Sequence, residues 1–276
     1  MTEIRFITCS TKPDMTGDDA LAAVALRKHG IEAIAEPWDI PSQSEHPAVL
    51  RSPWNYHLKP SEFLAWIGNQ QRPMWNSADT VRWNHDKFYL RELQQRGCPV
   101  IPTVFLKRGE EAHLPSILAG QGWSAAVVKP SISATAHLTS IATADNVSAL
   151  VREHSVLVQK FMPEIQSHGE LSLFFFNGVF SHASQKNAAP GDFRVQEEFG
   201  GRTSGTTVSA GLIDQAAAAL SLTPGTPHLY ARVDGILSGT IFFILEIELI
   251  EPCLYLATDP KAPARFAGAV AARLQV

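Results

Sequence analysis

The sequence has 276 residues, of which 45% are hydrophobic and 18% charged, and its formal net charge is −4. That length can bury one large core or two to three smaller ones. The charge balance offers no basic surface for nucleic acid or for a membrane, so we expect neither partner.

The start of the chain, MTEIRFITCS, lacks the basic and apolar regions of a signal peptide. The longest apolar run, around residues 241–250, is too short for a membrane span and carries acids. The three cysteines have no CxxC spacing and the ten histidines are scattered. We therefore expect a cytoplasmic protein without a zinc site.

The first 80 residues predict a small parallel α/β domain, because short strands alternate with helices. The predicted strands are residues 4–8, 31–36 and 48–52, and the predicted helices are 18–29 and 60–68. Residues 77–97 then read as one long amphipathic helix that ends at Gly97.

Two α+β units follow, which we expect to span residues 81–157 and 158–276. The first contains predicted strands at 102–106, 125–130 and 138–143 and helices at 114–120 and 146–153. In the second, Asn177-Gly178 between apolar runs predicts a hairpin. A second hairpin is predicted from 229–236 and 240–252, with helices at 209–221 and 264–274. The fold class is therefore mixed α/β and α+β.

The stretch FFILEIELIEP places Glu246 and Glu248 inside an otherwise buried strand. Alternation puts both carboxylates on one face, about 7 Å apart, where they repel each other unless a cation lies between them. An edge strand with one solvated face is the alternative. Asp234, in the preceding strand, can approach the same face. Three carboxylates with no nearby histidine or cysteine favour Mg²⁺.

Four basic residues complement these acids. Lys129 ends the apolar strand AAVVKP, Lys87 lies in the predicted long helix, and Lys186 and Arg194 flank the glycine-containing segment 186–201. Taken singly, such residues are more often solvated surface charges. Together with Mg²⁺ they are what phosphoryl transfer needs. Neither a GxxxxGK[ST] loop nor a GxGxxG loop is present.

Taken in order, seven motifs make the chain resemble the ATP-grasp superfamily, in its glutathione-synthetase/RimK-like branch, and it is similar to ligases of the D-cycloserine synthetase type. The motifs are WNHDKFYL, VVKPSISATAHLT, VLVQKFMPEI, GELSLFFFNGVFSHASQKN, PGDFRVQEEFGG, LYARVDGI and LEIELIEP. The resemblance implies an ATP-grasp fold, in which an N-terminal α/β domain precedes two α+β subdomains that clamp ATP.

The resemblance also implies roles for individual residues. Phosphates of ATP would be held by Lys87 and Lys129, and the flap over them would include Ser133. A hinge would hold adenine and ribose, and Glu170 would form a polar wall; the hinge residues are Gln159, Lys160, Phe161, Met162 and Glu164. The Mg²⁺ ligands would be Asp234, Glu246 and Glu248, with Mn²⁺ as a substitute, and Arg194 and Lys186 would neutralise the transferred phosphoryl group.

Two departures from the family pattern stand out. The flap, SISATAHLT, contains no glycine, and its serine and threonine hydroxyls are the expected compensation. Ser172 stands where glutathione synthetases carry an arginine, which argues against glutathione synthesis.

Four further residues are candidates for substrate contacts. Arg51 and Asn55 follow a predicted strand end, where α/β folds collect ligands. Arg51 would clamp a carboxylate or, alternatively, form a structural salt bridge. His182 would face the site or be a buried, hydrogen-bonded residue, and Gln196 lies in the glycine-containing segment.

The implied function is an ATP- and Mg²⁺-dependent ligase. It would activate a carboxylate of a small, amino-acid-like molecule as an acyl phosphate for attack by an amine, including ring closure as in cycloserine synthesis. The alternatives are a small-molecule kinase and a non-catalytic nucleotide-binding protein. We expect a small-molecule substrate, and a homodimer is the commonest assembly.

Overall fold

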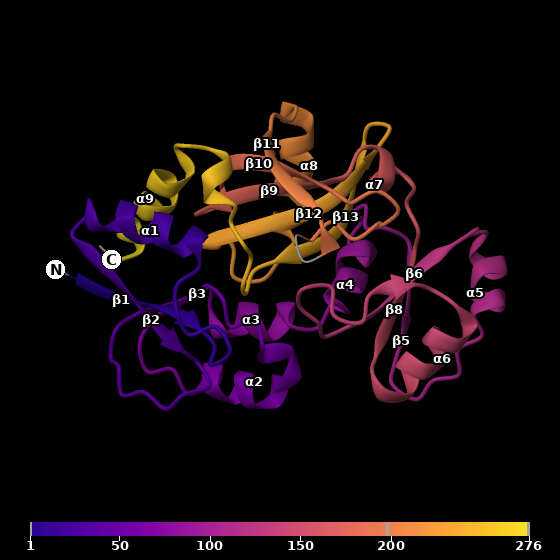
Figure 1. The fold of residues 1–276 in the computed structure, drawn as a ribbon, viewed down its shortest axis with the longest axis horizontal. Coiled ribbons are helices and arrows are strands. Elements are labelled where there is room, and N and C mark those ends of the chain that lie inside the picture. The colour runs from indigo at the N-terminus through magenta and orange to yellow at the C-terminus, as the bar shows by residue number, and fades with distance from the viewer. Residues whose placement is uncertain (1, 197–198, 275–276) are drawn as a thin grey trace.

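The computed structural model describes residues 2–196 and 199–274, which form three sheets with helices around them (Figure 1). The first is a parallel sheet in the order β2-β1-β3-β4. Its strands are β1 (Thr2–Thr8), β2 (Ile31–Pro37), β3 (Ala48–Leu50) and β4 (Met74–Trp75). Helix α1 (Gly17–Arg27) begins at a capping box between Thr16 and Asp19, which fixes its first turn.

The C-terminal helix α9 (Ala262–Leu274) returns to pack beside α1, so the two ends of the chain lie close together (Figure 1). Phe266 of α9 joins Ile4 and Phe6 of β1 and Phe174 and Tyr230 of the large sheet in one hydrophobic cluster. The N-terminal domain and the C-terminal part of the chain therefore share a core.

The central sheet is antiparallel, in the order β5-β8-β6-β7, and forms a separate lobe (Figure 1). Its strands are β5 (Thr103–Leu106), β6 (Ala126–Pro130), β7 (Ser140–Ile141) and β8 (Val156–Lys160). Helices α5 (Leu114–Gln121) and α6 (Ala144–Glu153) pack on it around Val128, Val147 and Val158. The predicted strand at 138–143 is reduced to the two residues of β7.

The large sheet is also antiparallel, in the order β11-β10-β9-β12-β13. Its strands are β9 (Glu170–Phe176), β10 (Val179–Asn187), β11 (Arg202–Thr206), β12 (Tyr230–Ser238) and β13 (Ile241–Glu248). Both predicted hairpins are confirmed. Asn177 and Gly178 have φ values of 48° and 77°, the left-handed pair that a two-residue hairpin turn requires.

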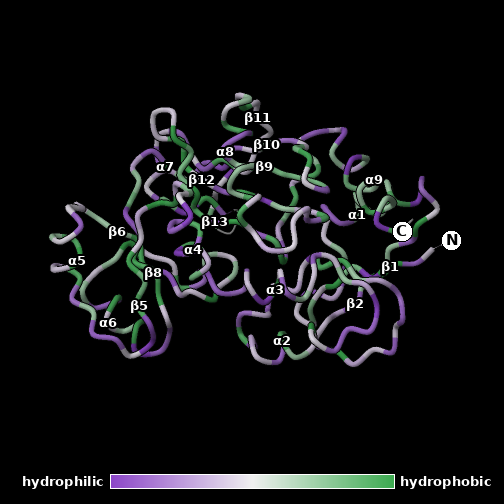
Figure 2. The backbone as a smooth tube through the Cα atoms, turned by 180° about the vertical axis from the view of Figure 1, so that it is seen from behind, coloured by the Kyte–Doolittle hydropathy of each residue, from purple (hydrophilic) through white to green (hydrophobic). Residues whose placement is uncertain are grey.

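Alternation along the large sheet separates an apolar face from a charged one. Helix α8 (Ala210–Ser221) covers the face that carries Val233 and Ile247. Asp234 and Glu246, the neighbouring positions, point to the other face. Figure 2 shows the hydrophobic stretches along the strands of these sheets and the hydrophilic ones on outer loops. In the described residues, no helix has the length and hydropathy that a membrane crossing needs.

The prediction of one long helix over residues 77–97 is wrong. The chain forms α3 (Ala78–Asn84) and α4 (Tyr89–Gln95), with a break between them. At this break the Lys87 N–H donates to the Ser131 carbonyl at 2.8 Å, and the Asp86 carboxylate accepts from the Phe88 N–H at 3.0 Å. These bonds replace helical ones and bring Lys87 to the cavity described below. Short helices complete the fold: η1 (Tyr56–Leu58), α2 (Pro60–Gly68), α7 (Glu164–Ser167) and η3 (Leu256–Thr258).

Strand β13 lies at the edge of the large sheet, and side chains from the α3–α4 region bond its outer edge. The Asn84 amide donates to the Ile247 carbonyl at 2.7 Å and accepts from the Leu249 N–H at 2.9 Å. The Tyr89 hydroxyl donates to the Ile247 carbonyl at 3.0 Å and accepts from its N–H at 2.8 Å. These bonds fix the orientation of β13 and hold Glu246 on the face opposite α8.

Candidate active site

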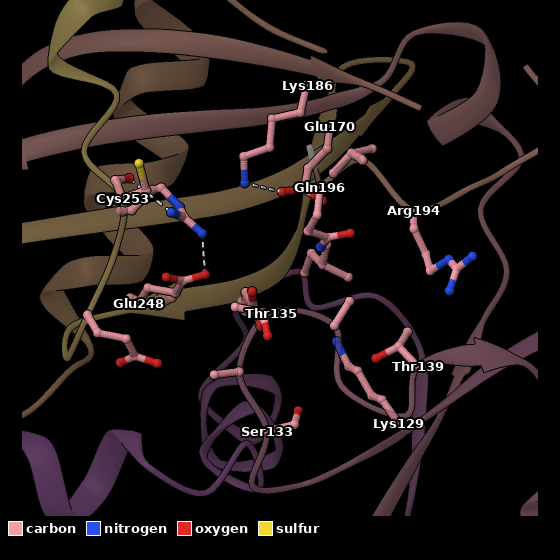
Figure 3. Close-up of a pocket in the computed structure, with 18 of the residues that line it drawn as sticks. Lys129, Ser133, Thr135, Thr139, Glu170, Lys186, Arg194, Gln196, Glu248 and Cys253 are labelled. Atoms are coloured by element: carbon pink, nitrogen blue, oxygen red, sulfur yellow. Dashed lines mark hydrogen bonds and ion pairs between the residues drawn. The ribbon is translucent and has the colours of Figure 1, made fainter. Parts of the chain in front are cut away.

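A cavity of about 760 Å³ is lined by residues of the central and large sheets and by loops and the start of α1 in the N-terminal domain. Lys129 comes from the central sheet, Lys186 and Glu248 come from the large sheet, and Trp54 and Tyr56 come from the N-terminal domain. In Figure 3, Lys129 points into the cavity from the side opposite Lys186.

Three carboxylates meet in this cavity region. Asp234 and Glu246 are register partners on β12 and β13, and Glu248 lies two residues further along β13. One oxygen atom from each lies within 4.8 Å of the others. Asp234 is fully buried, whereas Glu246 and Glu248 are partly exposed to the cavity. The structure thus brings together the three residues that the sequence suggested as Mg²⁺ ligands.

The electrostatics of the three carboxylates fit a hard divalent cation. Burial raises the pKa of Glu248 well above its usual range despite the opposing effect of Arg232, and the Glu246 and Asp234 carboxylates raise it further. Burial acts in the same direction on Glu246, but Lys87 and Lys129 outweigh it and lower the pKa of Glu246 to about 2. An oxygen-binding cation among the three would relieve their repulsion.

Arg232 is a site residue that the sequence interpretation missed. Its Nε lies 3.0 Å from both Asp234 carboxylate oxygens, its Nη2 contacts Glu248, and its Nη1 donates to the Cys253 carbonyl at 2.9 Å. The guanidinium is therefore bound to two of the three cluster carboxylates. The signal was present in ARVDGI, because residues two apart on a strand share a face.

Lys186 and Glu170 form a buried ion pair, which Figure 3 shows, and Lys186 also contacts Asp234 of the carboxylate cluster. The Lys186 Nζ lies 2.7 Å from Glu170 Oε1 and 3.2 Å from Asp234 Oδ2. Although burial and Arg232 disfavour its charge, Asp234 and Glu170 raise the pKa of Lys186 above its usual value. Ser172 donates to the Asp234 carboxylate at 2.5 Å, so this position supports an acid instead of supplying a cation.

The two lysines assigned to ATP phosphates both reach the cavity. Lys129 is buried, and burial lowers its pKa. The Lys87 Nζ lies 2.7 Å from the Ser133 carbonyl and 3.8 Å from Glu246 Oε2. Both cations thus lie close enough to the carboxylate cluster to share a polyanionic ligand with it.

The expected flap, residues 131–139, carries a backbone strain that glycines would avoid. Thr135, Ala136 and Leu138 have φ values of 50°, 54° and 56°. Each left-handed residue with a Cβ costs about 1–2 kcal/mol, so the surrounding contacts must offset this strain. Ile132 and Ala134 supply such contacts by packing into the N-terminal core. The flap is therefore docked against the N-terminal domain.

The expected hinge lies where β8 leaves the central sheet. Four of its residues line the cavity: Gln159, Lys160, Phe161 and Met162. The N–H groups of Lys160 and Phe161 already donate to the Pro102 and Ala125 carbonyls at 2.8 and 3.0 Å. Adenine would therefore have to be read by other main-chain groups of this segment.

Glu164, the expected ribose ligand, lies outside the cavity wall. Its Oε1 accepts from the Ser238 hydroxyl at 2.5 Å, and this bond lowers the pKa of Glu164. The other carboxylate oxygen, Oε2, has no hydrogen-bond partner among the described residues.

Arg194 lines the cavity but is engaged within its own segment. Its Nη2 lies 2.8 Å from Asp192 Oδ2, and its guanidinium lies 3.7 Å from the centre of the Phe199 ring. In Figure 3 it lies on the other side of the cavity from Glu248. Gln196 also lines the cavity, whereas residues 197 and 198 of this segment lie outside the described residues.

The three other substrate candidates require correction, because none of them lines the cavity. Arg51 is buried, with its Nε 2.7 Å from Asp19 Oδ1, so the structural salt bridge is the reading that the geometry supports. Asn55 bonds Asp39 at 2.7 Å. His182 stacks on Phe174 with ring centroids 4.3 Å apart.

The N-terminal end of the cavity contains residues that the sequence gave no reason to choose. Asp18 accepts from the Leu254 and Leu256 N–H groups at 2.8 and 2.6 Å, which ties α1 to the segment after β13. The Tyr255 ring in that segment lies 5.8 Å from Lys186 Nζ and 5.9 Å from the Arg232 guanidinium carbon. The N-terminal end of the cavity therefore lies next to Lys186 and Arg232, the two cations that contact the carboxylate cluster.

Comparison with known proteins identifies the family to which the chain belongs. The family model of the D-cycloserine synthetase DcsG N-terminal domain matches residues 4–77. The cycloserine biosynthesis protein DcsG of Streptomyces lavendulae is 31% identical over 279 residues, which cover 91% of this chain and 92% of that protein.

Comparison with solved structures gives the same relative and the same fold. The crystal structure of D-cycloserine synthetase DcsG matches with a TM-score of 0.88 and 28% identity over 99% of both chains. An ATP-grasp RimK domain protein from Sphaerobacter thermophilus shares the fold, with a TM-score of 0.68 and 17% identity over 98% of this chain and 99% of that one. The chain belongs to the D-cycloserine synthetase family of ATP-grasp ligases, which are ATP-dependent enzymes that form C–N bonds.

Proposed function

We propose that this protein is an ADP-forming, Mg²⁺-dependent ligase that closes a ring within a small amino-acid-like molecule, as in D-cycloserine synthesis. The observation that carries the proposal is the meeting of three carboxylates with Lys87, Lys129 and Lys186 around one cavity. This combination can hold a metal–triphosphate complex next to an acceptor carboxylate. Membership of the family supplies the reaction class.

Asp234, Glu246 and Glu248 would hold Mg²⁺, with Mn²⁺ as an expected substitute, since all three offer oxygen donors. When bound, the metal supplies positive charge at the phosphates of ATP. Lys129 and Lys87 lie on the central-lobe side of the cavity and would bind the α- and β-phosphates. The hinge segment would hold adenine, and the docked flap would cover the phosphates and exclude water.

In the first half-reaction, a carboxylate oxygen of the substrate attacks the γ-phosphorus of ATP, and ADP leaves. Arg232 and Lys186 line the cavity and contact the Asp234 carboxylate, so we assign them the neutralisation of the charge on the new acyl phosphate, with Arg194 joining when its segment closes. In the second half-reaction, an amine nitrogen of the same molecule attacks the acyl carbon. The C–N bond forms, the C–O bond to phosphate breaks and phosphate leaves. Positioning and charge neutralisation suffice, without a covalent enzyme intermediate.

The test is ADP release by the purified protein with amino acids and their hydroxamate or ureido derivatives, with products detected by mass. We expect ADP, phosphate and a dehydrated cyclic product in equal amounts. Hydroxylamine should divert the acyl phosphate into a hydroxamate. A stable phosphorylated product that needs no amine would replace this proposal with a kinase. If the protein binds nucleotide but turns over none of the acids, it is a non-catalytic nucleotide-binding protein and not a ligase.

A further inference from the structure

Among the described residues, five carboxylates line the cavity, and Glu251 differs from the other four. Each of the four lies within 4.0 Å of a lysine or arginine nitrogen: Asp18 with Arg51, Glu170 with Lys186, Glu246 with Lys87, and Glu248 with Arg232. Within residues 2–196 and 199–274, no such partner lies that close to Glu251. Glu251 also stands outside the three-carboxylate cluster.

The position of Glu251 is fixed by the N-terminal domain. Its main-chain carbonyl accepts from the Trp54 indole N–H at 3.1 Å, and its carboxylate lies close enough to the Tyr56 hydroxyl for each group to shift the pKa of the other. Tyr56 is itself buried, with its ring centroid 5.1 Å from that of Phe63. Trp54 and Tyr56 of the N-terminal domain therefore border Glu251 at the cavity wall.

In the part of the chain that the structure describes, the Glu251 carboxylate has no cationic partner close enough to balance its negative charge. Burial raises the pKa of Glu251 to about 7, and Glu246 adds to the rise against the opposing effects of Lys87 and Tyr56. The neutral Tyr56 hydroxyl does not replace the hydration that an ionised carboxylate loses on burial. A cation that entered the cavity would supply the missing partner.

We propose that Glu251 is a specificity-determining residue that binds the ammonium group of the substrate while the substrate carboxylate lies at the Arg232 side of the cluster. The proposal rests on the ring-closing function proposed above, and the ammonium group that it concerns is a different nitrogen from the one that closes the ring. Glu251 follows the metal-ligand candidate Glu248 by three residues, a span of at most about 10 Å. Glu251 and Arg232 both line the cavity, so a small amino acid that enters it can meet the two residues with its oppositely charged groups. Tyr56 then acts as a positioning residue for Glu251.

The ring that D-cycloserine contains provides a matched pair of probes. D-cycloserine carries one amine, and 1,2-oxazolidin-3-one is the same ring without it. Calorimetry on the wild-type protein with Mg-ADP present should show D-cycloserine binding about 10- to 100-fold more tightly, the value of one charge-assisted hydrogen bond. Glu251→Gln should remove that preference and leave the affinity for the amine-free ring unchanged.

Further variants separate binding from folding. Tyr56→Phe should reduce the preference for D-cycloserine in part. It should not change the affinity for the amine-free ring, whereas a general loosening of the fold would lower that affinity as well. Glu251→Asp should retain part of the preference. Glu153→Gln, the same chemical change at an exposed position of α6, should behave as wild type.

Three results would overturn the inference. The first is a Glu251→Gln protein that still prefers D-cycloserine. The second is a wild-type protein that does not discriminate between the two rings, or binds neither. The third is a changed Mg²⁺ requirement in Glu251→Gln, which would make Glu251 a ligand of the metal. ADP release with other acids is measured separately, so a failure here leaves the ligase proposal to be decided by its own test.

Discussion

The Lys87 ammonium lies 3.8 Å from a Glu246 carboxylate oxygen, and this pair connects the break between α3 and α4 with the edge strand β13. A phosphate-binding candidate and a metal-binding candidate are thereby adjacent before any ligand is considered. The contact exists only because the helix is interrupted at residues 85–88.

Changing Glu246 to Gln should lower ligase turnover by on the order of 100-fold or more at ordinary Mg²⁺ concentrations. The substitution removes a charged oxygen donor and keeps the shape of the side chain, so the fold should remain. ADP release measured against Mg²⁺ concentration, with circular dichroism as the folding check, tests this. Normal turnover in this variant would show that Glu246 is not a metal ligand and would support the alternative of a solvated residue on an edge strand.

ATP with Mg²⁺ should raise the melting temperature, and GTP should raise it less, because a hinge that fits adenine reads the base edge through main-chain groups. A ligand at 100 times its Kd that binds only the folded state adds about 2.7 kcal/mol. Differential scanning fluorimetry gives both shifts. Equal shifts with the two nucleotides would show that residues 159–162 do not select the base.

Arg194→Ala should lower kcat by on the order of 100-fold with a smaller effect on ATP affinity. The reason is that Arg194 is bound to Asp192 in this structure and would reach the phosphoryl group only when its segment closes. Single-turnover kinetics and nucleotide binding separate the two effects. Arg202→Ala, an exposed arginine on β11, is the control. Equal losses of binding and turnover would make Arg194 a ground-state anchor.

Asp18→Ala should lower the free energy of unfolding by about 2–4 kcal/mol, because it leaves the buried N–H groups of Leu254 and Leu256 without their acceptor. Urea unfolding of the variant measures the loss. Asp14→Ala, at an exposed position in the loop before α1, should cost far less. A loss no larger than that of Asp14→Ala would show that α1 does not anchor the segment after β13.

The stability of the protein should fall as the pH decreases from 6.5 to about 4, in part because of His228. Burial lowers the pKa of this histidine to about 4, and Arg273 contributes to the decrease. Between these pH values the unfolded chain binds a proton that the folded protein does not, so the fold loses up to about 3 kcal/mol. The slope should be shallower in His228→Gln than in wild type, and unchanged in the exposed control His154→Gln. Identical slopes in all three proteins would contradict this assignment.

Local sequence rules predicted the parts of the fold that local physics controls. The Asn177-Gly178 turn follows from left-handed backbone preference, and the convergence of Asp234 with Glu246 follows from strand alternation and a short hairpin. Those two rules also place Arg232 on the face of Asp234, so that residue was within reach of the sequence interpretation.

Features that depend on distant partners were not predictable in the same way. Residues 77–97 have a helical pattern throughout, and only the bond from Lys87 to Ser131 reveals the break. Arg51 follows a strand end as a ligand residue would, but Asp19 of α1 neutralises it. Glu251 and Tyr56 meet across nearly the whole chain, and no spacing in the sequence signals their contact.

The hydrogen bonds that Asn84 and Tyr89 make to β13 limit how two copies of this protein can associate. A sheet edge with free main-chain groups can be extended by a strand from another molecule. Along Ile247 and Leu249 these groups already have side-chain partners. A homodimer built by joining two large sheets at this edge would have to break those bonds and disturb Glu246. Any assembly that keeps the enzyme active must therefore use a different surface.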